Sequence, residues 1–156
     1  MLFRSDLLRQ SSIEDEALQL ELLTSAGEAG IRGPHVERAR GLLREAIEIA
    51  RRNGWVEPFC RACLSYAYRA EIVGTSDEEI VLLIEEALER LGDSALPVRA
   101  HLLSRLAIEV RYRAGGGLER ALALVAEAIA TARSASDPAA LARTLEDASG
   151  IRWSAE

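Results

Sequence analysis

Apolar residues recur along most of this chain at helical spacings of three and four, and no segment alternates apolar and polar positions as a half-buried strand would. The clearest helical segment carries Val36, Ala39, Leu43, Ala46, Ile47 and Ala50. The full pattern predicts seven helices, at about residues 13–28, 35–52, 58–73, 77–91, 97–114, 118–133 and 138–153. We therefore expect an all-α protein.

Helix-breaking and helix-capping residues stand between these segments. Ser11 with Glu14, and Ser76 with Glu79, have the spacing of capping boxes. Asp137-Pro138 is typical of a helix start, with an N-cap followed by proline at the first helical position. The expected breaks lie at Gly30–Pro34, Asn53-Gly54, Gly92 and Gly115–Gly117.

A tripeptide repeats at an interval of 41 residues, as Glu45-Ala46-Ile47, Glu86-Ala87-Leu88 and Glu127-Ala128-Ile129. Alanines at 26 and 67, and at 107 and 148, keep the same interval. A fixed period of this length marks a stack of similar units, each too small to bury its own apolar face. We expect one domain over residues 1–156, with helical hairpins at about 13–52, 58–91 and 97–133 and an unpaired or capping helix at about 138–153.

The second helix of each expected hairpin resembles that of the tetratricopeptide repeat, which carries Ala, a bulky apolar residue four later and Ala three after that. The matching triplets are Ala39-Leu43-Ala46, Ile80-Ile84-Ala87 and Ala121-Val125-Ala128. The longer, Ala- and Arg-rich repeat is similar to the helical arrays of large bacterial transcriptional regulators, which combine an AAA-type ATPase module with a LuxR-type DNA-binding domain. The resemblance implies a short right-handed α-solenoid whose odd-numbered helices line a groove, and a role in regulation.

Charge and hydropathy exclude some functions. The net charge of −6 argues against a nucleic-acid-binding surface. No apolar run approaches the roughly 20 residues of a membrane span, and the N-terminus does not resemble a signal peptide, so we expect a cytoplasmic protein. All 19 basic residues are Arg. Selection for bidentate anion contacts would explain that, but we favour a coding bias.

Cys60 and Cys63 form the motif most often associated with chemistry. A redox role would need a βαβ context, and a zinc site would need two more ligands, for which only His35 and His101 are available. We favour two buried cysteines that act as small apolar residues. A reversible redox role stays open.

Other catalytic patterns are missing. His101 has no nucleophile at a suitable spacing, and Gly115–Gly117 lacks the Lys of a phosphate-binding loop. We expect neither an enzyme nor a cofactor or metal.

The face of the odd-numbered helices opposite the alanines carries Arg and Tyr, the residue types enriched in binding hot spots. We expect a groove there that binds a protein or peptide partner, preferably an acidic segment. Its residues are Arg61, Tyr68, Arg69, His101, Arg105, Tyr112 and Arg143. The plain alternative is a set of solvated helix positions.

Two other functions stay open. One is a small-ligand sensor with an apolar pocket near Tyr66, Leu102 and Leu106, and the other is a dimerisation module of a transcriptional regulator. Ile151 and Trp153 lie on a helix without a hairpin partner. That helix could fold back on the third hairpin, could have lost a natural partner, or could form a homodimer.

Overall fold

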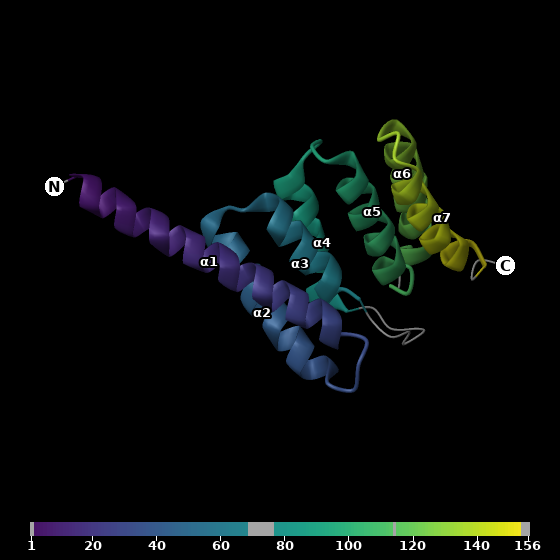
Figure 1. Ribbon diagram of the computed structural model, residues 1–156. Helices are drawn as coiled ribbons and strands as arrows, with labels where there is room; N and C mark the ends of the chain where they lie inside the picture. The colour runs from purple at the N-terminus through teal and green to yellow at the C-terminus, as the bar shows by residue number, and fades with distance from the viewer. Residues whose placement is uncertain (1, 69–76, 114, 154–156) are drawn as a thin grey trace. The chain divides into compact units, whose positions relative to one another are not determined.

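The computed structural model describes the backbone of residues 2–68, 77–113 and 115–153, and the side chains of residues 11–68, 77–113 and 115–151. These ranges form seven α-helices and contain no strand, which confirms the all-α prediction. The helices are α1 (Leu2–Gly30), α2 (Val36–Asn53), α3 (Val56–Tyr66), α4 (Glu78–Leu91), α5 (Leu96–Val110), α6 (Gly117–Ser134) and α7 (Pro138–Trp153) (Figure 1). The chain divides into two compact units, Met1–Tyr68 and Arg69–Glu156, which we describe separately.

In the first unit, α1 and α2 form the expected hairpin and lie side by side (Figure 1). Gly27 makes their closest approach possible, because a Cβ atom at this position would lie 2.5 Å from Cγ of the fully buried Leu43. Ala26, one of the alanines that keep the 41-residue interval, is exposed and does not supply this close contact. The neighbouring glycine occupies the packed stripe of α1 together with Leu20 and Thr24.

Helix α1 is longer than its sequence pattern predicts. It begins at Leu2 rather than near residue 13, and its N-terminal part extends past the end of α2 (Figure 1). Ser11 and Glu14 lie inside the helix and do not form a capping box at its start. The same Ser-x-x-Glu spacing fits an exposed helix face, and both residues are exposed.

Helix α3 packs against α2 and α1 and buries Phe59, Cys60, Cys63 and Tyr66. It ends at Tyr66, earlier than expected. The Tyr68 N–H donates to the Ser65 carbonyl, a bond across three residues that tightens the last turn. Residues 69–73 of the expected helix lie outside the described ranges.

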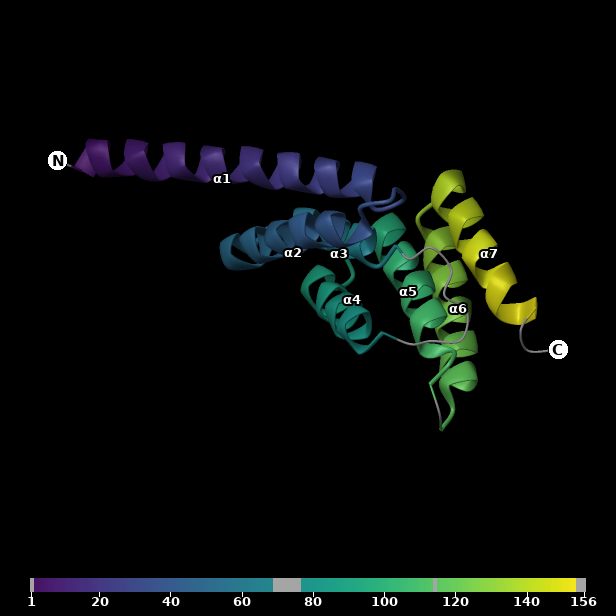
Figure 2. The same cartoon turned by 90° about the horizontal axis from the view of Figure 1, so that it is seen from below.

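In the second unit, α5 lies against α4, α6 and α7, and α7 packs against both α5 and α6 (Figure 2). Ile151 on α7 is fully buried by this packing. Of the three options for the last helix, folding back on the α5–α6 hairpin is the arrangement seen. The side chain of Trp153 lies outside the described residues.

Helix ends in this unit follow local chemistry. Asp77 accepts a hydrogen bond from the Glu79 N–H at 3.1 Å, so Asp77 caps α4 in place of the expected Ser76, which lies outside the described ranges. Asp137 accepts from the N–H groups of Ala139 and Ala140 at 2.9 and 3.2 Å, which confirms the predicted start of α7. Helix α5 ends at Val110, four residues before its expected end near 114.

The glycine run between α5 and α6 is needed by the backbone. Gly115 and Gly116 have φ values of +75° and +105°, which other residues rarely adopt. A Cβ atom at Gly117 would collide with the carbonyl oxygen of Val110. The backbone conformation and the close contact therefore explain the three consecutive glycines, and an anion-binding role is not needed to explain them.

The repeated alanines are packing positions. Ala46, Ala87 and Ala128, the central residues of the three tripeptides, have no exposed surface. The expected hairpin at 58–91 crosses the boundary between the two units, so that hairpin and the solenoid geometry stay predictions.

Candidate functional site

Helix α5 reaches the surface along one narrow strip. Beyond its first turn, every residue is buried except His101, Arg105 and Ile108. These three lie four and three residues apart and share one side of α5, and Tyr112 follows in the turn after the helix ends. We call His101, Arg105, Ile108 and Tyr112 the α5 strip.

Helix α7 adds charged groups beside the start of this strip. Ser104, which is fully buried on α5, donates to the Asp147 carboxylate with an Oγ–Oδ2 distance of 2.7 Å. Arg143 lies one turn before Asp147 on the same helix and is exposed. The structure therefore brings together three of the expected site residues, His101, Arg105 and Arg143.

The environment of His101 favours its neutral form. Desolvation by burial is the largest effect, and with the positive charges of Arg143 and Arg105 it lowers the pKa from 6.5 to about 4. Asp147 acts in the opposite direction but does not cancel these effects. His101 is thus uncharged at neutral pH in a locally basic neighbourhood.

Ser104, His101 and Asp147 are not arranged as a nucleophilic triad. The Ser104 hydroxyl is placed to donate to the Asp147 carboxylate and lies 3.1 Å from the backbone carbonyl oxygen of His101. In a triad the imidazole would stand between the hydroxyl and the carboxylate. The observed contacts instead link α5 to α7.

Arg105 is held in place by an acidic neighbour. Its Nη2 atom lies 3.3 Å from Oε1 of Glu109, and the Glu109 side chain is only 3% exposed. A buried carboxylate needs a positive partner, so much of the Arg105 charge stabilises the fold. Of the two arginines beside His101, Arg143 carries the more accessible charge.

At the other end of the strip, Tyr112 lies beside Arg111. The Arg111 guanidinium carbon is 4.4 Å from the centre of the Tyr112 ring. Its Nη1 atom also donates to the Gly150 carbonyl at 3.2 Å, which ties the end of α5 to α7. This places a half-buried aromatic ring beside a fixed cation.

The expected site residues of the first unit have other contacts. Arg61 forms a two-pronged pair with Glu28, with N–O distances of 2.9 and 2.8 Å. Ser65 also donates to Glu28, at 2.9 Å, and these contacts, the Arg61 bond foremost, lower the pKa of that carboxyl. Arg61 therefore joins α3 to α1.

Tyr68 lies under Arg32, whose guanidinium carbon is 4.5 Å from the ring centre. Tyr66 is approached in the same way by Arg40 and Arg44 of α2, at 4.8 and 5.2 Å. Arg69 lies outside the described ranges. All three tyrosines of the chain thus have Arg neighbours. The arginines on α2 were not expected, because the predicted groove is lined by odd-numbered helices alone. The spacing of four between Arg40 and Arg44 could have indicated them.

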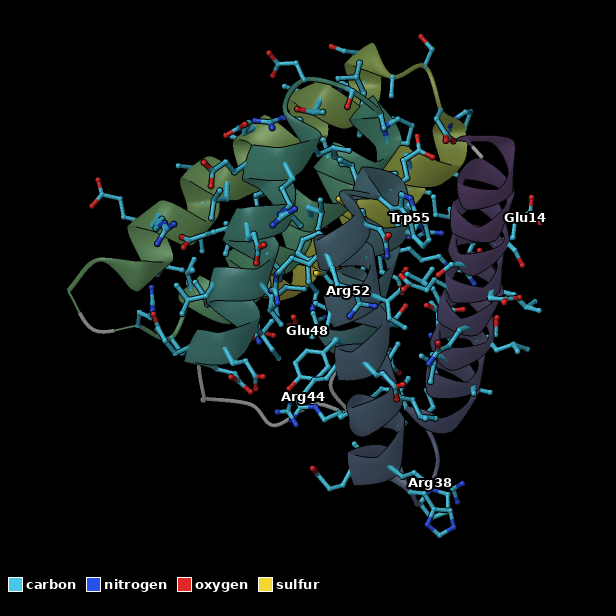
Figure 3. The ribbon with its side chains drawn as sticks, turned by 90° about the vertical axis from the view of Figure 1, so that its left-hand side faces the viewer. Glu14, Arg38, Arg44, Glu48, Arg52 and Trp55 are labelled. Atoms are coloured by element: carbon cyan, nitrogen blue, oxygen red, sulfur yellow. The ribbon has the colours of Figure 1, made fainter. Side chains whose placement is uncertain are left out.

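The outer face of α2 has the character of a solvated surface. Arg44, Glu48 and Arg52 follow one another at intervals of four and are all exposed (Figure 3). Arg51 pairs with Glu48, and Arg52 pairs with Glu16 of α1. The charges of Glu48 and Arg52 are therefore neutralised by partners within the α1–α2 hairpin.

Cys60 and Cys63 are buried thiols on α3 with no exposed surface. Their burial agrees with the packing role that we favoured. Among the described side chains, those of residues 11–68, 77–113 and 115–151, no group of three or more His, Cys, Asp or Glu is arranged to hold a metal ion. None of the helices described in those ranges is both long and apolar enough to span a membrane.

Comparison with known proteins found no match: no protein-family model matches the chain, and neither does a curated protein or a solved structure.

Proposed function

We propose that this chain is a non-catalytic protein–protein interaction module that binds an acidic partner segment along the α5 strip and Arg143. The observation that carries this proposal is the position of the strip. Helix α5 is enclosed by α4, α6 and α7. Beyond its first turn it presents only His101, Arg105 and Ile108, and Tyr112 follows two residues after its end. A helix packed on several sides holds its exposed groups in a fixed arrangement, which lowers the entropic cost of binding.

The residue types of the strip fit such a role. Tyr and Arg are enriched among residues that dominate binding energy, and both occur here beside an apolar Ile. A neutral His101 can donate or accept a hydrogen bond without adding charge at neutral pH. Arg143 supplies an accessible cation for a partner carboxylate.

The structure also guides the choice of variants. Arg61 and Arg105 look like obvious targets, but each pairs with a carboxylate of its own unit. Charge reversal at Arg105 would place two carboxylates side by side in a buried position and would test folding rather than binding. Arg143 and Tyr112 are the better choices.

A peptide-display selection on the folded chain tests the proposal. We expect wild-type protein to enrich sequences rich in Asp and Glu, and Arg143→Glu to lose that enrichment, with Tyr112→Ala weakening it. Arg38→Glu is the matched control, because Arg38 is an exposed arginine on α2 of the other unit (Figure 3). Equal enrichment by the Arg143→Glu and Arg38→Glu proteins, or no acidic preference in wild type, would refute the assignment.

We also propose that the module acts in cytoplasmic regulation. This part rests on the resemblance of the repeated helices to arrays in bacterial transcriptional regulators. An array of this kind provides surfaces for partners, while catalytic or DNA-binding steps are performed by other modules.

A further inference from the structure

The outer side of α6 carries a second ordered strip, separate from the α5 strip. Its residues are spaced by three or four and are all exposed: Glu119, Leu122, Ala126, Ala130 and Arg133. Such spacing places side chains in one row along a helix, the pattern by which two helices pack. We call these five residues the α6 strip.

One position of this strip differs in exposure from its equivalent one repeat earlier. Leu122 is 38% exposed, whereas Val81, which lies 41 residues before it on α4, has no exposed surface. The same contrast holds on α7, where Leu145 is 45% exposed and its equivalent on α5, Ser104, is fully buried. On α6, the apolar residue Leu122 is therefore uncovered where its apolar counterpart on α4, Val81, is covered.

The charges of α6 divide into two kinds. Arg120 and Glu127 are engaged inside the unit, with Glu85 at 2.5 Å and with Arg99 at 3.1 Å. Glu119 and Arg133 form no ion pair within the part of the chain that the structure describes. They belong to the strip and mark its two ends.

The ends of the strip are complementary to each other. Glu119 and Arg133 are 14 residues apart, with Ala126 midway between them. At 1.5 Å per residue this separation is about 21 Å along the helix axis. If a second copy of α6 lies antiparallel with Ala126 opposite Ala126, each Glu119 meets an Arg133.

We propose that the α6 strip is a dimer interface with a second copy of this chain, in which the two α6 helices pack antiparallel about a twofold axis at Ala126. Glu119 then faces the partner's Arg133, and Leu122 packs against the partner's Ala130. The small side chains at Ala126 and Ala130 allow the helices to approach closely. A symmetric pair uses the same patch on both copies, so each contact occurs twice.

The charges at the two ends of the α6 strip have another explanation, and the experiment must distinguish it from a dimer interface. Glu119 is in the first turn of α6 and Arg133 is in the last turn, where each sign stabilises the helix dipole. Reversing either charge would then weaken α6 slightly, and reversing both would weaken it most. A dimer interface gives the opposite order for the double variant.

Sedimentation velocity over a concentration series tests the proposal. We expect wild type to dimerise with rising concentration, while Glu119→Arg and Arg133→Glu each stay monomeric because like charges meet across the axis. Mixing the two single variants should restore a dimer, and so should combining both changes in one chain. Glu89→Arg, an exposed position on α4, is the control and should dimerise as wild type does.

Circular dichroism of each variant shows whether the chain keeps the helix content of wild type. A monomeric wild type at every concentration overturns the proposal. Single variants that dimerise like wild type also overturn it. A double variant that dimerises more weakly than either single variant overturns it as well.

Discussion

At the scale of single residues, burial decides what each expected site residue can do. Arg61, Arg105 and Arg143 look alike in the sequence, yet the first two hold carboxylates of their own unit. Arg143 is exposed beside the half-buried His101. The same residue type therefore serves as a structural link at two places and as an accessible cation at a third.

His101 should make stability depend on pH. Its pKa in the folded protein is about 4, below the 6.5 of the unfolded chain, so only the unfolded chain gains a proton as the pH falls between these values. Stability is unaffected above pH 6.5 and decreases below it, by about 3 kcal/mol at pH 4.

Urea unfolding of wild type and His101→Gln at several pH values measures this loss. The difference between the two proteins should be constant above pH 6.5 and should change steadily below it, since Gln does not titrate. The same comparison removes the effect of carboxylates that titrate in both proteins. If the unfolding free energies of the two proteins differ by the same amount at every pH down to 4, His101 is protonated as easily in the folded state as in the unfolded one.

At the scale of helices, close packing depends on where small residues lie. Gly27 and Gly41 are both helical glycines of the α1–α2 hairpin, but their surroundings differ. A Cβ atom at Gly27 would press on Leu43, whereas a Cβ atom at Gly41 would have no neighbour within 4 Å.

We expect opposite effects from alanine at these two positions. Gly27→Ala should destabilise the protein by about 1–3 kcal/mol, because the buried Leu43 must move. Gly41→Ala should stabilise it by about 0.5–1 kcal/mol, because alanine is the better helix former. Urea unfolding midpoints give both values. A neutral or stabilising Gly27→Ala would contradict the packing described for the hairpin.

The sequence predicted the helices well and their ends less well. The spacing of apolar residues by three and four identified all seven elements, because the buried face of a helix repeats at that spacing. Helix ends depend on a few hydrogen bonds, and the pattern could not show that α3 would stop at Tyr66 or that α1 would start at Leu2.

The candidate site was predictable in part for a physical reason. Helical spacing aligned His101 and Arg105 on one side of α5, since that alignment is a local property of a helix. Pairing between helices is not local. The Glu28 partner of Arg61 is 33 residues away, and no spacing rule connects the two.

At the scale of the whole molecule, the net charge of −6 makes a small basic site informative. General electrostatic attraction would not bring an acidic segment to an acidic protein. Any binding must then arise from local groups such as Arg143 and Tyr112, and it should be confined to their surroundings.

The most direct test of the proposed function is therefore to locate an acidic peptide on the folded chain. An oligo-glutamate peptide would be titrated into isotopically labelled protein while the backbone amide resonances are followed by NMR. We expect shifts concentrated around His101, Arg105, Tyr112 and Arg143. Shifts of equal size around exposed arginines elsewhere, such as Arg38, or no shifts at all, would contradict it.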